Sequence, residues 1–232
     1  MTDAKHVGVI MDGNRRFSKQ LMQAPWKGHE WGARKLEDLV TWCKETNVRE
    51  LTVFALSIQN FSRPKKEFNY LMQLFEKELT DLLERQEELA EDGIRIHFIG
   101  RIQLLPDSLV ARIQEIHEAT ATNQDFQLNI AVAYGGREEI VDAAKQLAVD
   151  VQEGNLDASA VDEHVFARRL YLQSEPDLII RTGGEQRTSN FLSWQSTYTE
   201  WFFVDELWPA FSKETFTSCL DAYASRERRF GE

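Results

Sequence analysis

Short apolar segments alternate with helical patterns along the whole chain. Five segments have the length and composition of buried strands: 6–11, 51–56, 94–99, 128–133 and 178–180. Apolar residues between them recur at helical spacing, for example at Leu36, Leu39, Val40 and Cys43, and again at Val141, Ala144, Leu147 and Ala148. Because parallel strands need long crossovers, this alternation predicts an α/β fold with a mainly parallel central sheet of about six strands flanked by helices. The 232 residues suit one such domain over 1–232.

The charge and the cysteines of the chain restrict its partners and its compartment. Aspartate and glutamate number 38 against 27 lysine and arginine, which gives a net charge of −11. A chain this acidic does not bind nucleic acid or anionic lipid through overall charge. Cys43 and Cys219 belong to no zinc or CxxC spacing, and the sequence contains no signal peptide or membrane-spanning run. We therefore expect a cytoplasmic protein with no nucleic-acid partner.

The longest helical pattern begins after Pro64 and runs to Gly93. Its apolar stripe includes Leu71, Phe75 and Leu79. A wide stripe on so long a helix has two interpretations. It packs in the core or against a second copy of the chain, or it forms the wall of an elongated apolar cavity. Periodicity alone does not separate the two.

A loop rich in anion-binding groups follows the strand-like run near residue 180. Residues 181–190 contain the guanidiniums of Arg181 and Arg187, the hydroxyl of Ser189 and two adjacent glycines. Arginine forks bind phosphate oxygens bidentately, and hydroxyls and glycine amides add donors. Because the loop leaves a buried strand, we expect it at the carboxyl edge of the sheet, where α/β proteins bind ligands. The loop therefore predicts a phosphate site.

A second group of polar residues follows the first strand. It consists of Asp12, Gly13, Asn14, Arg15 and Arg16. The carboxylate can hold a hard cation such as Mg²⁺, while the arginines neutralise a diphosphate that the cation also contacts. The alternative is an Asp-Gly turn that caps a helix.

Two further segments lie beside expected strand and helix ends. Lys27 and His29 stand where a helix begins, and the free amides and dipole of a helix start favour an anion. A structural histidine is the alternative there. Residues 57–64 follow the second strand and include Asn60 and Arg63. They suit a mobile lid, or an ordinary strand-to-helix loop closed by proline.

Several common phosphate and metal motifs are absent from the sequence. It contains no GxGxxG, no GxxxxGK[ST] and no HExxH motif, which argues against Rossmann dinucleotide-binding, P-loop and zincin proteins. It also contains no Asp-Asp pair, so the aspartate-rich metal clamps of trans-type prenyl synthases are missing.

Several short motifs follow one another along the chain in the order typical of one enzyme family. They are 6–14, 28–29, 60–64, 129–137 and 181–195, followed by Tyr198, Glu200, Trp208-Pro209 and 226–231. Together they resemble the cis-prenyltransferases, the undecaprenyl diphosphate synthase family, over essentially the whole chain. The resemblance implies a Mg²⁺-dependent homodimeric transferase. Such an enzyme extends an allylic diphosphate by condensation with isopentenyl diphosphate, and each step forms a cis double bond and releases pyrophosphate.

The resemblance also implies roles for individual residues. Asp12 would hold Mg²⁺ with help from Glu200, and the proton would leave to Asn60 or, equally, to a diphosphate oxygen. The allylic diphosphate would be bound by Gly13, Asn14, Arg15, Arg16, Lys27, His29 and Arg63. Isopentenyl diphosphate would be bound by Arg181, Arg187 and Ser189, and by Arg229 and Gly231 of a tail that reaches into the partner subunit.

A growing prenyl chain requires an apolar tunnel, because each five-carbon unit buries roughly 3–4 kcal/mol of apolar free energy. The helix after Pro64 would supply one wall. By resemblance the tunnel would be lined by Ala55, Leu71, Phe75, Leu79 and Val132. A long product further implies that the enzyme works at a membrane surface.

Other functions remain open at this point. A short-chain or irregular, non-head-to-tail prenyl synthase fits the same features. An aspartate-nucleophile phosphatase would want a second acid where Asn14 stands, and non-catalytic partner subunits typically lose the Asp-Gly-Asn loop that this chain keeps. Arg15 and Pro25 depart from many bacterial members of the family and resemble archaeal and eukaryotic ones, which leaves the allylic primer undetermined.

Overall fold

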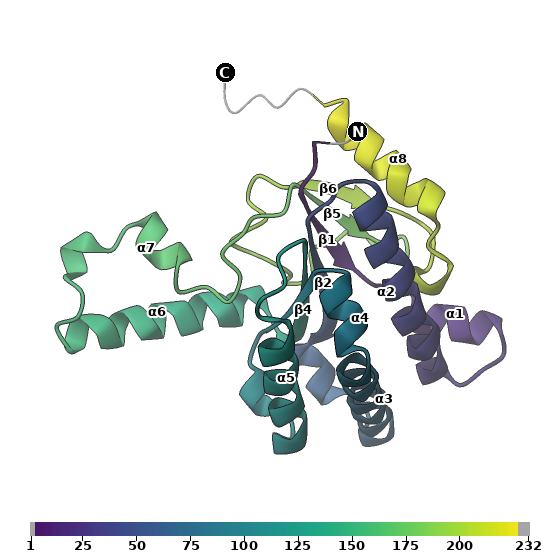
Figure 1. The fold of residues 1–232 in the computed structure, drawn as a ribbon, viewed down its shortest axis with the longest axis horizontal. Coiled ribbons are helices and arrows are strands. Elements are labelled where there is room, and N and C mark those ends of the chain that lie inside the picture. Colours follow the sequence, from purple (N-terminus) through teal and green to yellow (C-terminus); the bar gives the residue numbers. More distant parts are fainter. Residues whose placement is uncertain (1–2, 227–232) are drawn as a thin grey trace.

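A computed structural model of the chain describes residues 3–226 and contains one six-stranded sheet (Figure 1). The strand order is β3-β4-β2-β1-β5-β6, and every neighbouring pair is parallel. The strands are β1 (His6–Ile10), β2 (Glu50–Ser57), β3 (Ile94–Ile99), β4 (Phe126–Tyr134), β5 (Leu178–Arg181) and β6 (Glu200–Phe203). The predicted α/β fold with a parallel sheet of about six strands is confirmed.

Helices and short 3₁₀ turns connect the strands. The helices are α1 (Asn14–Gln20), α2 (Gly28–Glu45), α3 (Lys65–Glu84), α4 (Gln86–Glu91), α5 (Asp107–Thr120), α6 (Gly136–Gln152), α7 (Glu163–Ala167) and α8 (Lys213–Ala224). The 3₁₀ turns are η1 (Pro25–Lys27), η2 (Ile58–Ser62), η3 (Ile102–Leu104), η4 (Ala158–Ala160) and η5 (Trp208–Ala210). Within residues 3–226 no helix combines the length and hydrophobicity needed to cross a membrane.

The strand order places a binding crevice beside β1. From β1 the chain first passes to β2, β3 and β4 on one side of the sheet, and only then to β5 and β6 on the other side. The connections therefore run in opposite directions beyond the carboxyl ends of β1 and β5. In open α/β sheets this switch point is where ligands bind. The two loops with predicted anion-binding groups follow exactly these two strands.

One face of the sheet packs against helices. Buried side chains of α2, α3, α4, α5 and α8 form a single cluster with alternate residues of the strands, such as Val7, Val53 and Ile96. Because successive strand residues point to opposite faces, this cluster defines the main core. The predicted helical stripe with Leu39 and Cys43 lies in it.

The opposite face is covered mainly by loop segments. Ile10, Ile99 and Ile179 pack there against Phe191 and Leu192 of the loop that follows β5. Further toward the amino ends of the strands, this face carries buried polar groups. His6 Nε2 lies 2.7 Å from Thr52 Oγ1. Hydrogen bonds between side chains thus replace hydrophobic packing at that end of this face.

Three sequence predictions need correction. β6 was not predicted as a strand, because its run is only four residues long and includes Glu200. The helix after Pro64 is not continuous to Gly93, since α3 ends at Glu84 and α4 begins at Gln86. On α6, Leu147 is buried but Val141 is 47% exposed, and Figure 1 shows α6 and α7 extending away from the sheet.

We predict that Gly13→Ala destabilises the fold more than Gly154→Ala. Both glycines have positive φ, 116° and 75°, which strains an alanine by roughly 1–3 kcal/mol. A Cβ at Gly13 would also lie 2.9 Å from Leu207 Cα, whereas none of the described atoms lies within 4 Å of a Cβ at Gly154. Chemical denaturation should therefore show the larger loss for Gly13→Ala. Equal losses would contradict the close approach of the Asp12 loop and Leu207.

Candidate functional site

An ion pair joins the two loops at the switch point. Asp12 follows β1, and Arg181 is the last residue of β5. Arg181 Nη2 donates a 2.7 Å hydrogen bond to Asp12 Oδ2, and the Arg181 side chain is only 3% exposed. The predicted cation ligand and the predicted isopentenyl diphosphate residue therefore contact each other directly.

Arg181 also holds the loop that follows it. Its Nη1 donates to the carbonyl oxygen of Arg187 at 2.5 Å and to Ser189 Oγ at 2.6 Å. Its Nε is buried and has no hydrogen-bond partner among residues 3–226. A buried N–H without a partner costs free energy. This unpaired donor lies within the candidate anion site, among the residues that line the cavity.

Arg16 completes the contacts of the Asp12 carboxylate. Arg16 Nη2 donates to Asp12 Oδ1 at 3.2 Å, and its Nη1 donates to the carbonyl oxygen of Gly183 at 2.6 Å. A Cβ at Gly183 would lie 2.4 Å from Arg16 Nη2. The glycine therefore lets the guanidinium lie against the backbone, and it explains one of the paired glycines of this loop.

His29 lies in the first turn of α2, close to Asn14. Both side chains have a buried polar atom without a partner in the described part of the chain, His29 Nε2 and Asn14 Oδ1. Burial, together with smaller effects of the nearby Arg63 and Arg15, lowers the pKa of His29 from 6.5 to about 4, and Glu67 opposes this shift in part. The imidazole is therefore neutral at pH 7 in the free protein.

A buried carboxylate holds two more of the predicted basic residues together. Glu67 Oε1 accepts a 2.6 Å hydrogen bond from Arg63 Nη1 and lies 3.6 Å from Arg15 Nε. The Glu67 side chain is 7% exposed. Glu67 was not predicted as a site residue. Its position four residues after Arg63, at the start of a helix, nevertheless favours an ion pair between the two.

The predicted lid segment forms the ordered turn η2. Asn60 Oδ1 accepts a 3.1 Å hydrogen bond from the backbone N–H of Ser57, and the Ser57 side chain caps the same turn. This reciprocal pair is a capping box. Asn60 is thereby fixed at the edge of the site.

A single cavity of about 790 Å³ connects the polar site to an apolar interior. Eight predicted site residues line it: Asp12, Asn14, His29, Asn60, Arg63, Arg181, Arg187 and Ser189. The five predicted tunnel residues line it as well: Ala55, Leu71, Phe75, Leu79 and Val132. Leu71, Phe75 and Leu79 of α3 therefore line the cavity and also pack in or against the main core, so both of these interpretations of the stripe hold.

Helix α2 forms a further wall of this cavity that was not predicted from the sequence. Ala33, Leu36 and Val40 line it opposite α3. Leu36 and Val40 belong to the helical stripe already visible in the sequence, so periodicity contained the signal. Periodicity does not show, however, that this stripe of α2 faces α3.

Five predicted site residues within residues 3–226 do not line the cavity: Gly13, Arg15, Arg16, Lys27 and Glu200. Three of them lie next to the cavity: Arg16 contacts Asp12, Arg15 contacts Glu67, and Gly13 packs against Leu207. Lys27 is exposed at the end of η1. Arg229 and Gly231 lie outside the described residues.

Glu200 is not near Asp12 within one chain. The register pairs Glu200 with Leu178 and Leu178 with Val7, at the amino ends of the strands, whereas Asp12 follows their carboxyl ends. The three-residue offset along the strand alone is about 10 Å. Glu200 instead accepts a hydrogen bond from Arg226. Within one chain Asp12 and Glu200 are therefore too far apart to bind one metal ion, and a shared metal stays a prediction for a site that two chains complete.

A buried carboxylate supports the loop that contains Ser189. Glu139 Oε1 accepts hydrogen bonds from the backbone N–H of Tyr171 at 2.8 Å and from Gln195 Nε2 at 3.0 Å, and Oε2 accepts one from Tyr134 OH at 2.5 Å. Burial raises the pKa of Glu139. These contacts tie α6, β4 and the end of the loop to one another.

The chain is similar in sequence to archaeal enzymes. It is 46% identical to the tritrans,polycis-undecaprenyl-diphosphate synthase (geranylgeranyl-diphosphate specific) of Pyrococcus abyssi, over 98% of this chain and 86% of that protein. It is 45% identical to the enzyme of the same name from Methanopyrus kandleri, over 98% and 84%.

Two solved structures have the same fold. Lavandulyl diphosphate synthase from Lavandula x intermedia, in complex with dimethylallyl diphosphate, superposes with a TM-score of 0.92 at 35% identity, over 99% of this chain and 98% of that one. A "probable undecaprenyl diphosphate synthase" from Campylobacter jejuni gives 0.83 at 32%, over 100% of both chains.

A family model agrees with these relatives. The model described as "Putative undecaprenyl diphosphate synthase" matches residues 10–231. Its match covers the Asp12 loop, the cavity walls and the Arg181 loop. The chain therefore belongs to the undecaprenyl diphosphate synthase family and is a prenyltransferase of the cis-prenyl chain-elongating type.

Proposed function

We propose that the protein condenses isopentenyl diphosphate with an allylic diphosphate primer to form cis-polyprenyl diphosphates. The observation that supports this most strongly is the single cavity, in which guanidiniums and a carboxylate at one end lead into an apolar interior. A substrate with a charged head and a hydrocarbon tail matches both ends. The alternatives of a phosphatase or a non-catalytic subunit give no reason for the apolar half.

The two diphosphates would bind on either side of the Asp12 and Arg181 ion pair. Asn14, Arg16, His29 and Arg63 would bind the allylic diphosphate, and Gly13 would allow the tight turn beside it. Arg181, Arg187 and Ser189 would bind isopentenyl diphosphate, with Arg181 Nε as a donor that lacks a protein partner among residues 3–226. Arg15 and Lys27 would add positive charge at the rim.

The residues at Asp12 fit a magnesium ion. Mg²⁺ is commonly bound by one or two carboxylates together with substrate phosphates and water, and Asp12 offers a carboxylate that is 29% exposed beside the arginines. Within residues 3–226 no group of three or more His, Cys, Asp or Glu side chains could hold a metal alone, so the diphosphate must supply ligands. A bound Mg²⁺ would neutralise charge on the departing pyrophosphate.

The catalytic work of the protein would be positioning and electrostatics. The leaving diphosphate gains negative charge as its allylic carbon becomes cationic, and Arg16 and His29 would stabilise that charge. Arg181 and Ser189 would hold the second substrate so that its double bond faces the cation. The proton would then leave to a diphosphate oxygen, because the side-chain amide of Asn60 is a far weaker base than a diphosphate. Asn60 Oδ1 accepts a hydrogen bond from Ser57 and would help to shape the site.

The relatives suggest which primer the enzyme uses. Archaeal proteins at 45% to 46% identity are named as specific for geranylgeranyl diphosphate, and we extend this preference to the present chain. Irregular condensation is a second candidate, because the structure with a TM-score of 0.92 is a lavandulyl diphosphate synthase. The apolar cavity beyond the polar site favours chain elongation, since each added unit gains roughly 3–4 kcal/mol of apolar burial.

We further propose that the protein is a homodimer that acts at a membrane surface. On α6, Val141 and Val149 are 47% and 48% exposed, on a helix that extends away from the sheet (Figure 1). Apolar side chains on such a helix favour a contact with a second copy. The tail residues Arg229 and Gly231, and the separated Glu200, would then contribute to the site of the partner. A long prenyl product would leave to a bilayer.

The reaction can be tested with purified protein, Mg²⁺, labelled isopentenyl diphosphate and allylic primers of ten, fifteen and twenty carbons. We expect a ladder of extractable cis-polyprenyl products, made most efficiently from the twenty-carbon primer, and none in excess EDTA. Product made from dimethylallyl diphosphate alone would instead indicate irregular condensation. No labelled product with any primer would exclude the proposed reaction.

We expect Asp12→Asn to lower kcat at least about 100-fold. The asparagine keeps an oxygen that accepts from Arg181, but it loses the charge that binds the cation. Condensation should be lost even at temperatures where the variant is fully folded, and thermal unfolding should begin earlier because the buried Arg181 loses its charged partner. Asp81→Asn, which breaks an exposed ion pair with Lys77, provides the control and should retain full activity. Near-normal turnover of Asp12→Asn would remove this carboxylate from the mechanism.

We expect His29 to make the protein less stable in acid. Its pKa falls from 6.5 in the unfolded chain to about 4 in the fold, so the unfolded state binds an extra proton between these values. The contribution of His29 to the free energy of unfolding is complete above pH 6.5 and is lost as the pH falls toward 4. His29→Asn should therefore reduce this acid loss by roughly 2–3 kcal/mol.

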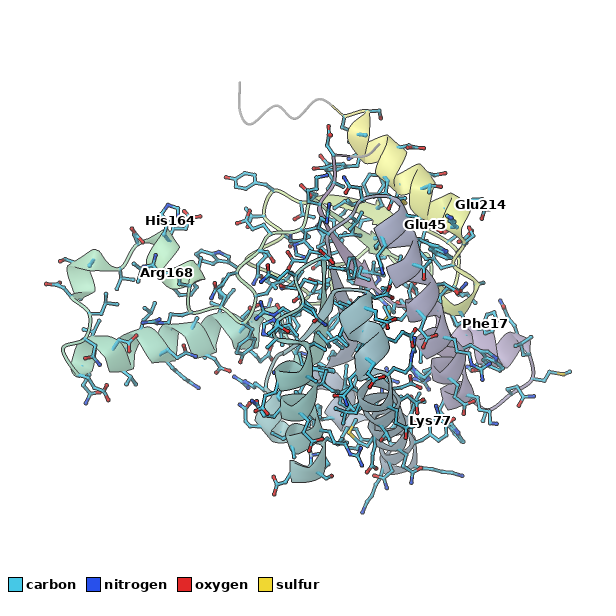
Figure 2. All side chains as sticks on the ribbon, in the orientation of Figure 1. Phe17, Glu45, Lys77, His164, Arg168 and Glu214 are labelled. Atoms are coloured by element: carbon cyan, nitrogen blue, oxygen red, sulfur yellow. The ribbon has the colours of Figure 1, made fainter. Side chains whose placement is uncertain are left out.

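The matched control for His29→Asn is His164→Asn. His164 is exposed on α7, away from the sheet (Figure 2). Denaturant titrations at pH 7 and pH 4.5 would compare the three proteins. The assignment of His29 as a neutral buried base fails if both variants show the same acid dependence as the parent.

A further inference from the structure

The end of the cavity opposite Asp12 is lined by charged side chains. Glu37, Arg85, Glu88 and Asp92 border it there, whereas the middle of the cavity is apolar. The anion site lies at the start of α3, and Arg85 follows the twentieth and last residue of that helix. At 1.5 Å per residue, the twenty residues of α3 span about 30 Å.

Arg85 bridges the helices that form the two walls. Its Nε and Nη2 donate to Glu88 Oε2 and Oε1, both at 2.9 Å, in a bidentate fork. Its Nη1 donates to Glu37 Oε1 on α2 at 2.8 Å. Arg85 is also the residue at which α3 stops and α4 begins. The break in the helix thus places a guanidinium across the space between α2 and α4.

These contacts oppose further entry of hydrocarbon. A prenyl chain that grows from the anion site is buried among Leu36, Leu71 and Phe75, and each unit gains from leaving water. At Arg85 the next unit meets three ionised groups instead. It must displace their water or separate the ion pairs, and removing water from charged groups is unfavourable. The favourable free energy of burying another five-carbon unit is therefore lost at Arg85.

We infer that the Glu37, Arg85 and Glu88 cluster, here called the charged collar, limits the length of the prenyl product. This inference rests on the proposed function and adds a specificity-determining element to it. The collar does not contact the Asp12 or Arg181 loops, so it acts on when elongation stops and not on the condensation itself.

The test is the product distribution of Arg85→Leu. Leucine removes the charge and extends the apolar wall, and the two glutamates lose the group that holds them across the opening. With the primer that the parent uses best and excess isopentenyl diphosphate, we expect the main product to lengthen by at least one five-carbon unit. The rate of the first condensation and the KM of both substrates should stay within about twofold, because the collar lies at the other end of the cavity.

Two control variants separate the collar from general effects. Arg85→Lys retains a positive charge and should give products close to those of the parent. Lys77→Ala breaks an exposed ion pair with Asp81 on the outer surface of α3 (Figure 2), away from the cavity lining. It should leave the distribution unchanged. Thermal unfolding of each variant would show that it folds.

The outcomes distinguish this inference from the proposed function. If no protein, the parent included, forms prenyl products, the proposed function itself fails. If the parent gives a ladder and Arg85→Leu gives the same ladder, the function stands and the collar only stabilises the corner between α3 and α4. Lengthening in Lys77→Ala to the same extent would equally overturn the role of the collar. Because an unfolded Arg85→Leu would report nothing, Glu37→Gln with Glu88→Gln is the second test, and an unchanged ladder there counts against the collar.

Discussion

The ion pair between Asp12 and Arg181 holds the catalytic edge of this protein together. Arg181 ends β5 and Asp12 lies just after β1, and the Arg181 guanidinium, only 3% exposed, would be a costly isolated charge. Paired, they fix the β1 loop against the β5 loop, and Arg16, Ser189 and Gly183 attach to the same pair. The carboxylate also makes the strongly basic site less repulsive before substrate arrives. A diphosphate that binds here would exchange hydrogen-bond partners with Arg181 and Arg16, whose charges the fold already holds close together.

The proposed chemistry follows from this arrangement. Most of the hydrogen-bond donors of Arg181 bind protein groups, so the side chain holds the loop after β5 in place in addition to its proposed contact with substrate. The remaining donor at Nε and the neutral His29 would gain partners in the proposed complex with a diphosphate. Donors that are already held in place by the fold would supply the preorganisation that an ionising leaving group requires.

Sequence reasoning reached most of the fold and of the site for identifiable reasons. The strands β1 to β5 are short, apolar and separated by helical periods, so both their existence and their parallel order were readable. The anion residues follow strand ends, where topology gathers them. Other features depend on three-dimensional partners. No glycine or proline marks the break at Arg85, β6 is a short aromatic edge strand, and motif matching cannot show that Glu200 and Asp12 stand at opposite edges.

Helix α2 belongs to both ends of the cavity. Its first turn carries His29 in the polar site, and Glu37 lies two turns further along the same unbroken helix. The helical rise fixes their separation at about 12 Å, whatever side chains lie between them. Substitutions along α2 can therefore widen or narrow the cavity or remove the charge at its far end, but they cannot move Glu37 away from His29. A longer interior would need inserted residues, at about 5.4 Å for each added turn, with a matching insertion in α3 to keep the two walls in register.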